Sequence, residues 1–302
     1  MSTAIIVVNF NCEDETISYV EKIAKFNIID KIIVVDNMST TIGAFDELKK
    51  LEKINKNKIK VIQTDKNGGY SYGNNFGVKY LQKEEKKRKV KYDYIIISNP
   101  DIEIEEKAIE NSIKVLESQD EIAVVAPRMY YKDGNPARRS AWKLRTPLRD
   151  MVHSTRLLEL LFYKVLRNGE YKEEDYKTDL LIVEAISGSF FIIKKDVFEK
   201  INLFDENVFL FYEEDILGKK LQDLNLKIVS LNTEKFIHYE SQTIGKVYNY
   251  FAKMKLLFES IMYYQTTYNN ICIGKKIIFN ILNVCRKIEL CIEVPIRKLL
   301  KK

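Results

Sequence analysis

Polar side chains follow four successive apolar segments in the first third of the sequence. Each segment ends in asparagine or aspartate, and such amides and carboxylates at one edge of a sheet would form a crevice for a polar ligand. The alternative is that Asn and Asp follow strands only because they form turns. The residues concerned are Asn9 and Asn11, Asp36 and Asn37, Asp65 and Asn67, and Asn99 and Asp101.

The segment Asn99-Pro100-Asp101 contains the most informative of these carboxylates. Proline fixes the turn, so Asp101 is expected to point outward, where a hard cation such as Mg²⁺ binds through oxygen together with substrate phosphates. Glu105 and Glu106 follow closely and are expected to favour the start of a helix. We therefore predict one metal-binding carboxylate in this loop.

A glycine-rich stretch runs from Asn67 through Gly68 to Asn75 and Gly77. Its glycines permit close approach of the backbone to a ligand, and its amides are hydrogen-bond donors. The spacing matches neither a P-loop nor a dinucleotide-binding fingerprint, so those nucleotide-binding folds are disfavoured. The alternative interpretation is a flexible turn that an asparagine caps.

Three consecutive acids, Glu213, Glu214 and Asp215, follow an aromatic run. Like charges crowded in an apolar frame raise carboxylate pKa values toward the range useful to a general base. A helix N-terminus also favours acids for reasons unrelated to catalysis. The chain has two histidines, His153 and His238, which leaves few ways to build a histidine-dependent nucleophilic triad.

The elements that would position these residues are strands and helices in alternation. Short apolar runs separated by amphipathic stretches are typical of buried parallel strands joined by helices, and they predict a doubly wound α/β sheet. The expected strands are 4–10, 31–35, 59–63, 92–98 and 122–126, and the expected helices are 14–26, 42–54, 72–83 and 105–118.

The pattern is irregular over residues 128–146 and then helical around 154–166. Regularity returns near Leu180, where residues 183–193 predict a strand pair or one bent strand around Ser187-Gly188-Ser189. Short helices at 196–201 and 213–224 and a strand that ends near His238 complete the region. No repeat or low-complexity linker interrupts it.

The positive charge of the chain is concentrated at its C-terminal end. The formal net charge is +6, while residues 246–302 hold eleven Lys or Arg against three Asp or Glu, a balance of +8. We expect a catalytic domain over 1–245 and a basic, helical, amphipathic extension over 246–302. No recognisable nucleic-acid-binding module accompanies this charge, so nucleic acid is not an expected partner.

The extension has an apolar face, and Pro295 is expected to kink or restart its helix. A basic amphipathic helix predicts peripheral attachment to the inner face of a membrane. The alternative is packing against the catalytic domain or against a second subunit. The residues of the face are Ile278, Ile281, Cys285, Ile288, Ile292, Ile296 and Leu299.

The four cysteines form no CxxC pair and have no histidine clustered near them. They are expected to be reduced and mostly buried, as in a cytoplasmic protein. The N-terminus lacks the basic region and cleavage site of a signal peptide, and no apolar run approaches the length of a membrane-spanning helix. The cysteines are Cys12, Cys272, Cys285 and Cys291.

Taken together and in order, these segments resemble the family 2 glycosyltransferases of the GT-A fold, over roughly residues 4–245. The resemblance is to the rhamnosyltransferase-like and galactofuranosyltransferase-like branch that builds bacterial surface polysaccharides such as O-antigen and capsule. It implies a mostly parallel central sheet flanked by helices. The matching segments are residues 7–11, 34–39, 67–77, 99–101, 187–189, 204–206, 213–215 and His238.

The resemblance also implies roles for individual residues. Asp101 and His238 would hold a divalent metal, Mg²⁺ or Mn²⁺, on the donor diphosphate, and Arg139 and Trp142 would face the acceptor. Arg138 belongs to the same basic loop, which has the alternative interpretation of a surface loop with a buried tryptophan. The nucleotide-sugar contacts implied are Asn9, Asn11, Asp36, Asn67, Gly68, Asn75, Asn99, Ser187 and Gly188.

The reaction implied is an inverting transfer of a sugar from a UDP- or dTDP-sugar to a saccharide or lipid-linked acceptor. Glu214 matches the family's catalytic base best, with Glu213 and Asp215 as alternatives. Two other functions compete with this prediction: a nucleotidyltransferase, whose basic glycine-rich signature is missing after Val8, and a catalytically silent glycan-binding or scaffold protein.

Overall fold

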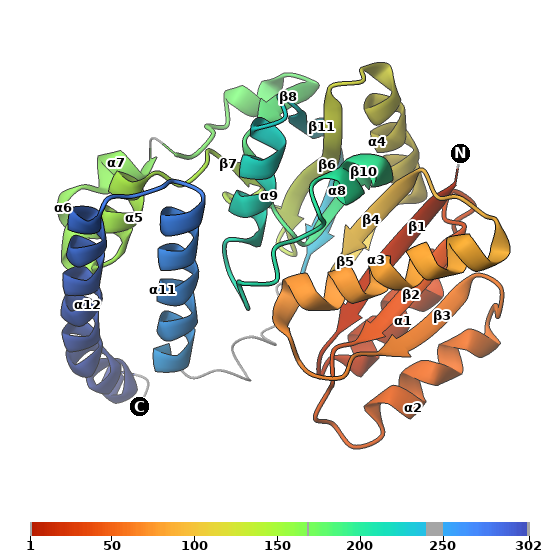
Figure 1. Ribbon diagram of the computed structural model, residues 1–302, viewed down its shortest axis with the longest axis horizontal. Coiled ribbons are helices and arrows are strands. Elements are labelled where there is room, and N and C mark those ends of the chain that lie inside the picture. The colour runs from red at the N-terminus through yellow and green to blue at the C-terminus, as the bar shows by residue number, and fades with distance from the viewer. Residues whose placement is uncertain (1, 168, 240–249, 301–302) are drawn as a thin grey trace.

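The computed structural model describes residues 2–167, 169–239 and 250–300, and Figure 1 shows how its elements are arranged. One half of the central sheet is parallel, with strand order β3-β2-β1-β4. Every residue of β2 is buried, because helices cover both faces of a parallel sheet. The strands are β1 (Thr3–Asn9), β2 (Lys31–Asp36), β3 (Ile59–Gln63) and β4 (Tyr94–Ser98).

The other half of the sheet is mixed. β10 (Phe190–Lys194) lies antiparallel between β4 and β6 (Ile122–Tyr131), and β11 (Lys227–His238) runs parallel to β6. Two short strands, β5 (Ile102–Ile104) and β8 (Leu180–Val183), pair antiparallel with β11. The sequence predicted β6 to end at residue 126, but its pairing with β11 extends it to residue 131.

Two apolar cores lie on the two faces of the sheet. In β1, Ile5 and Val7 pack in one core while Ala4 and Ile6 pack in the other, as expected from alternation along a strand. Figure 1 shows α3 crossing in front of the parallel strands. Helices α1 (Glu13–Ile23), α2 (Ala44–Lys49) and α4 (Glu106–Ser118) contribute to the first core, and α3 (Gly69–Arg88) and α8 (Lys195–Lys200) to the second.

The segment predicted as one helix around residues 154–166 is divided into short helices. Ser154 is the C-cap of the first of them, and Thr155 caps the next, because its hydroxyl accepts a hydrogen bond from the Leu158 amide. The helices are α5 (Pro147–His153), α6 (Arg156–Leu161) and α7 (Tyr163–Arg167). The helix predicted over 42–54 is likewise divided into α2 and a 3₁₀ turn, η1 (Lys50–Lys53); a second such turn is η2 (Asp175–Lys177).

The strand pair predicted around Gly188 is present, but its strands belong to different sheets. β9 (Ala185–Ile186) pairs with β7 (Ala141–Trp142) in a separate two-stranded ribbon, while β10 enters the main sheet. The chain therefore crosses from ribbon to sheet through residues 187–189, beside the start of α9 (Glu213–Gln222).

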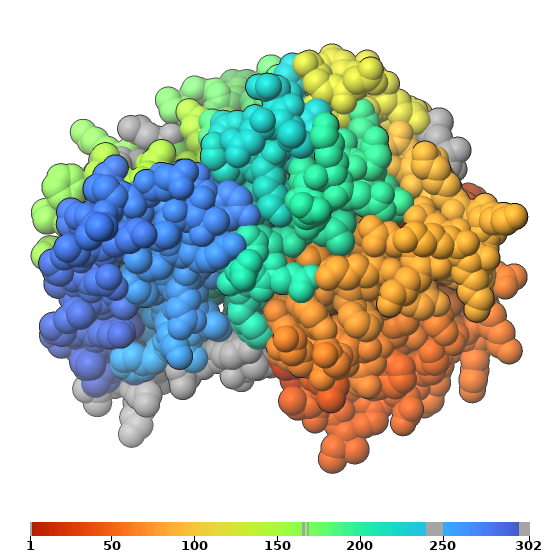
Figure 2. All heavy atoms as spheres, in the orientation of Figure 1, coloured from red at the N-terminus to blue at the C-terminus, as the bar shows by residue number. Residues whose placement is uncertain are grey.

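Two long helices, α11 (Tyr250–Thr267) and α12 (Ile273–Leu300), form one end of the molecule together with α5, α6 and α7 (Figures 1 and 2). Ile261, Tyr264 and Phe279 of these long helices pack with Tyr212 and Ile216. These two residues belong to the described residues up to 239, which the sequence predicts as the catalytic domain and which we call the catalytic part. The predicted domain boundary at residues 245 and 246 lies outside the described residues. Within the described part of the chain, no helix is long and apolar enough to cross a membrane.

Two predictions about the C-terminal helices need correction. The helix continues through Pro295, so the predicted restart is wrong, while the predicted kink stays a prediction; Pro295 is exposed, so the carbonyl group that loses its partner can bind water. The prediction of mostly buried cysteines is wrong: Cys12 is buried, but Cys272, in the connection before α12, is exposed, and α12 turns Cys285 and Cys291 away from the protein. Of the predicted apolar face, Ile296 and Leu299 have side chains outside the described set.

Candidate active site

The carboxyl ends of the parallel strands bring the predicted polar residues together. Asn9 and Asp36 are register partners on β1 and β2, and the Asn9 amide donates to the Asp36 carboxylate over 3.2 Å. Asp36 also accepts from Gln63 at the end of β3, at 2.8 Å, and from the Ser39 hydroxyl, at 2.5 Å. Asn9 and Asp36 are fully buried. They therefore form the floor of this edge, whose ligand contacts stay a prediction.

Asn11 holds the loop above that floor. Its backbone has a φ of 54°, and its side-chain oxygen accepts from the Thr40 amide at 2.8 Å. The Ser39 hydroxyl accepts from the Asn11 amide and from the Asn9 side chain, at 3.0 and 2.9 Å. Asn11 thus links the ends of β1 and β2 through their loops, and asparagine tolerates the left-handed conformation that this requires.

The glycine-rich turn packs tightly against the segment that leads to α9. Gly69 has a φ of 85°, and a Cβ atom there would lie 1.9 Å from the Phe209 carbonyl oxygen. A Cβ atom on Gly68 would overlap the Tyr72 ring at 2.3 Å. The Asn67 side chain caps the turn by accepting from the Gly69 amide, at 3.1 Å. Both glycines are therefore required by packing, whatever ligand the turn contacts.

Asn75 connects α3 to the segment before α9. Its side-chain nitrogen donates to the Phe204 carbonyl at 2.9 Å and to Glu206 at 2.8 Å, and its oxygen accepts from the Phe204 amide at 3.0 Å. Only 2% of Asn75 is exposed. The structure therefore gives Asn75 a clamping contact, and its predicted part in the donor pocket stays a prediction.

Asp101 and His238 come together from distant parts of the chain. His238 pairs with Ile102 at the junction of β5 and β11, and its Nε2 atom lies 3.4 Å from Asp101 Oδ1. Asn99 lies in the same loop, and its backbone amide donates to the Ser189 carbonyl at 2.8 Å. Within the described residues no cluster of three or more His, Cys, Asp or Glu surrounds this pair.

One carboxylate and one imidazole are a donor set that fits a divalent cation completed by substrate phosphates. Mg²⁺ commonly binds through one or two protein groups and retains positions for phosphate and water. The Asp101 and His238 side chains are 9% and 17% exposed, so the pair reaches solvent. The residues present therefore fit the metal that the resemblance implies, provided that the donor supplies the remaining ligands.

Gly188 lies between the Glu214 and Tyr70 side chains. Its amide donates to Glu214 Oε1 at 3.1 Å, and its carbonyl accepts from the Tyr70 hydroxyl at 2.6 Å. A Cβ atom on Gly188 would lie 2.7 Å from that Glu214 oxygen and 2.9 Å from the Tyr70 hydroxyl. Ser187 and Ser189 share a hydroxyl hydrogen bond of 2.8 Å on either side of it. Glycine is therefore the residue that leaves room for both contacts.

The three acids at the start of α9 have different surroundings. Glu213 and Asp215 are buried, whereas Glu214 is half-buried. Burial raises the pKa of all three carboxyls, and the Glu214 charge adds to the increase for Glu213. The pKa of Asp215 rises to about 7, although the charge of Arg145 opposes the effect of burial. Glu214 is thus the acid among the three that keeps part of its surface exposed to solvent.

The backbone before these acids is strained. Phe211 and Tyr212 have φ values of 74° and 73°, in a region that aromatic residues rarely adopt. Helix α11 supports this turn: the Ser260 hydroxyl donates to the Leu210 carbonyl at 2.8 Å, and the Tyr264 ring lies 5.2 Å from the Tyr212 ring. The C-terminal helices therefore help to fix the position of the three acids.

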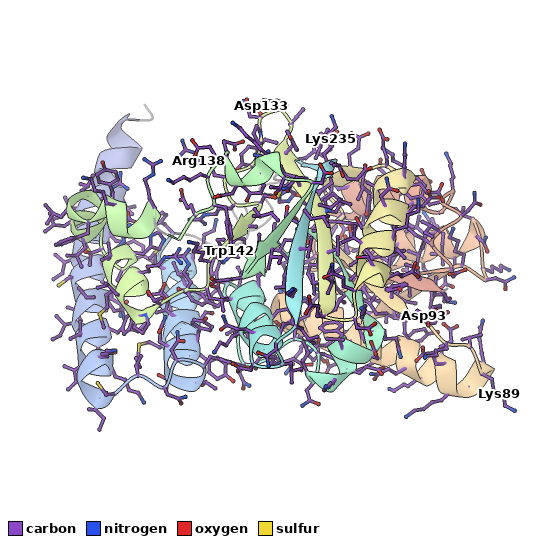
Figure 3. The ribbon with its side chains drawn as sticks, turned by 90° about the horizontal axis from the view of Figure 1, so that it is seen from above. Lys89, Asp93, Asp133, Arg138, Trp142 and Lys235 are labelled. Carbon is purple, nitrogen blue, oxygen red and sulfur yellow. The ribbon has the colours of Figure 1, made fainter. Side chains whose placement is uncertain are left out.

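The predicted acceptor residues reach the same acids from the ribbon. The Trp142 indole donates to Asp215 at 3.2 Å, and the Arg145 amide donates to the other oxygen of Asp215 at 3.1 Å. Figure 3 shows Trp142 beside α9. Arg139 is exposed; burial raises the pKa of Glu214, and the charge of Arg139 opposes that increase.

The sequence did not single out Tyr70, Arg145 or Tyr212, which the structure brings to the site. Tyr70 lies inside the glycine-rich stretch, and an aromatic residue among glycines could have been predicted from the sequence as a site residue. Arg145 interacts with Asp150 and Asp215 through the tertiary structure, so the sequence around Arg145 could not predict these interactions.

Comparisons with known proteins identify the family and the fold. The model of the family described as Glycosyl transferase family 2 matches residues 4–202, about two thirds of the chain. A relative from Haloferax volcanii, the Low-salt glycan biosynthesis hexosyltransferase Agl10, is 27% identical over 235 residues, which are 78% of this chain and 66% of the relative.

Three solved structures share the fold at low identity. GalNAc-T7 with UDP, GalNAc and Mn²⁺ has a TM-score of 0.57 at 16% identity, and the match covers 79% of this chain and 44% of that one. The mannosyltransferase PcManGT from Pyrobaculum calidifontis with GDP-Man and Mn²⁺ has a TM-score of 0.55 at 14% identity, with 86% of this chain and 63% of that one covered. S. aureus TarS 1–349 with UDP has a TM-score of 0.51 at 16% identity, with 91% of this chain and 77% of that one covered. The predicted GT-A fold is confirmed. With a family model that matches most of its length, the chain belongs to glycosyl transferase family 2.

Proposed function

We propose that the protein is an inverting hexosyltransferase that uses a nucleotide-diphosphate sugar. The observation that carries this proposal is the Gly188 bridge, in which one residue bonds both Glu214 and Tyr70 beside the loop that holds Asp101. It joins a predicted base to a predicted diphosphate site at the carboxyl edge of a parallel sheet. The hexosyltransferase name of the haloarchaeal relative, and the GDP-Man and UDP bound to structural neighbours, support the same reaction class.

Glu214 would act on the acceptor. Its carboxylate would take the proton of an acceptor hydroxyl while the oxygen bonds to the anomeric carbon from the face opposite the diphosphate. The bond from that carbon to the diphosphate oxygen breaks, and the electron pair leaves with the diphosphate. Because the hydrogen bond from Gly188 fixes the carboxylate, the base would be positioned before the acceptor arrives.

Asp101 and His238 would hold a divalent metal, which when bound supplies a positive charge to the leaving diphosphate. Asn9, Asn11, Asp36 and Asn67 are proposed to shape the nucleotide side of the pocket. Trp142 and Arg139 are proposed to face the acceptor, since an indole can stack on a sugar ring and a guanidinium can bind a phosphate.

The acceptor is proposed to be a saccharide or a lipid-linked oligosaccharide of a cell-surface glycan. A name from glycan biosynthesis on the haloarchaeal relative supports this class. A cytoplasmic location with the C-terminal helices on the inner face of the membrane belongs to the same proposal. Rhamnosyl transfer is one of the hexosyl activities that a donor panel would test.

The proposed base is tested by comparing Glu214→Gln with Asp215→Asn in transfer assays over a panel of UDP-, dTDP- and GDP-sugars. Loss of the base is expected to lower kcat by about a hundredfold or more. Asp215→Asn is expected to raise KM for the acceptor more than it lowers kcat, because Asp215 positions Trp142.

If Asp215→Asn lost turnover while Glu214→Gln kept it, the base would be Asp215. Unchanged transfer in both variants would remove both acids as the base, whereas no transfer by the wild-type protein over the whole panel would favour a non-catalytic glycan-binding protein. Circular dichroism and thermal melting of both variants separate loss of chemistry from loss of folding.

The proposed metal site is tested by chelation. Removal of divalent ions with EDTA is expected to abolish transfer, and Mn²⁺ or Mg²⁺ to restore it. Asp101→Asn is expected to lower kcat by about a hundredfold and to weaken the dependence on metal concentration. Asp133→Asn, at an exposed loop position, is the matched control. Full activity in EDTA would remove the metal from the proposal.

A further inference from the structure

Helix α12 turns an apolar face toward solvent. Five aliphatic residues repeat along it at spacings of three and four, so they share one face. Each of these residues is more than half exposed, which is unusual for so many aliphatic residues on one face of a helix. They are Ile277, Ile281, Val284, Ile288 and Ile292, with exposed fractions of 55, 56, 55, 59 and 60%.

The opposite face of α12 is the one that packs against the protein. Phe279 and Leu290 are buried there. Arg286 donates to Glu289 at 2.8 Å and to Glu293 at 3.0 Å. The helix is thus already attached through a face that includes charged side chains, and its more continuous apolar face remains uncovered within the described part of the chain.

A second exposed apolar cluster lies beside the first. Leu157, Leu160 and Leu161 of α6 are 60 to 64% exposed, and none of the residues of this helix is buried. Glu289 joins the two clusters, because its carboxylate accepts from the Leu157 amide at 3.2 Å while Ile288 and Ile292 flank it on α12. We call these exposed residues of α6 and α12 the end surface; Figures 1 and 2 show the two helices at the same end of the molecule.

Basic side chains border the end surface. Lys287 of α12 and Lys164 of α7 are exposed, and the Arg156 side chain is 57% exposed. Apolar residues bordered by lysine and arginine fit the boundary between acyl chains and anionic headgroups. A second copy of the chain would bring this same positive charge against itself, which disfavours a symmetric dimer through this face.

We propose that the end surface binds an anionic lipid bilayer, with α12 lying in the plane of the interface and α6 inserting beside it. The sequence indicated membrane contact through the C-terminal extension; the structure adds α6, from within the catalytic part, and identifies which face of α12 contacts lipid. The proposal deepens the function proposed above, because an enzyme held on a bilayer meets lipid-linked acceptors in two dimensions.

The end surface is also mechanically connected to the acids. α11 packs between α12 and the catalytic part, where Gln265 donates to Asp150 of α5 at 2.5 Å and Tyr264 packs on Tyr212. A bilayer bound through α12 and α6 would therefore hold the whole catalytic part in one orientation.

The test is co-sedimentation of the full-length protein with vesicles of phosphatidylcholine, with and without phosphatidylglycerol. Wild type is expected to bind the vesicles that contain phosphatidylglycerol. Ile281→Gln with Ile288→Gln is expected to weaken that binding by about tenfold or more, since glutamine removes apolar area without adding charge. Leu157→Gln with Leu161→Gln is expected to act in the same direction. Ile42→Gln, at a fully exposed isoleucine before α2, is the matched control.

A second readout uses the native thiols. Bound vesicles are expected to slow the modification of Cys285 and Cys291 by a charged, water-soluble reagent, with the sites resolved by peptide mapping. Equal binding of the α12 double variant and wild type would overturn the proposal, and so would no binding by wild type. A wild-type dimer that the same variant converts to a monomer, in sedimentation without vesicles, would assign the face to a second copy. None of these readouts requires sugar transfer, so they fail or succeed independently of the proposed reaction.

Discussion

The three consecutive acids of α9 have different partners. Glu214 accepts from the Gly188 amide and keeps part of its surface exposed, while Asp215 accepts from the Trp142 indole and the Arg145 amide. Glu213 is buried, and its Oε1 atom has no hydrogen-bond partner in the described part of the chain. A helix N-terminus favours acids at all three positions, so burial and partners distinguish them.

Trp142 provides a direct way to observe Asp215. It is the one tryptophan in the chain, so the intrinsic tryptophan fluorescence reports on a single site. Because Asp215 accepts from its indole and has a pKa of about 7, the fluorescence is expected to titrate with a midpoint near pH 7. Asp215→Asn is expected to abolish the transition, and Asp133→Asn to leave it in place.

The raised pKa of Asp215 also makes the free energy of unfolding depend on pH. The folded pKa of Asp215 is above its ordinary value of 3.8, so the stabilisation linked to its proton is fully present below that value. It is lost as pH rises through about 7, and the Asn variant should lack this dependence. A fluorescence midpoint near 4 in wild type would contradict this assignment.

At the scale of elements, the site depends on the contact between the 187–189 crossover and α9. Gly188→Ala would place a methyl group within 2.7 Å of Glu214 and 2.9 Å of the Tyr70 hydroxyl, so one of them must move. We expect kcat to fall by about tenfold to a hundredfold, because small displacements of a positioned group are costly. Steady-state kinetics with saturating donor measure this effect.

Gly274→Ala is the matched control, because a Cβ atom there comes no closer than 4.0 Å to another residue. It is expected to leave both kcat and the melting temperature near their wild-type values. A Gly188→Ala enzyme with wild-type kcat would show that the Glu214 position tolerates displacement, and would weaken its assignment as the base.

The parallel strands and the polar ends of β1 and β2 could be predicted from sequence, because strands buried on both faces read as continuous apolar runs. The residues of the Asp101 and His238 pair could be named through the family resemblance, but their approach to 3.4 Å depends on β5 and β11, and β5 was too short to predict. The bridge through Gly188 depends on tertiary packing that no local pattern records.

At the scale of the whole molecule, the sequence could not predict which helix faces pack against the protein. The spacing of the apolar residues on α12 is the same whether that face is buried or exposed, so sequence left packing and membrane contact as alternatives. The structure places Phe279 and Leu290 against the protein and leaves Ile281 and Ile288 outside. Likewise, the helix predicted around 154–166 is divided at Phe162, whose backbone leaves the helical conformation, into α6 and α7.

The position of β10 in the sheet also has a consequence for folding. β6 lies between β10 and β11, and both of these neighbours are later in the chain. During synthesis, β1 to β4 can pair as they emerge, while β6 has no partner in the main sheet until β10 is made, and gains its second partner only with β11. The centre of the sheet therefore closes last, through contacts of long sequence separation, which are slow to form. Until that closure, the edges of β4 and β6 are the ones exposed to pairing with other chains.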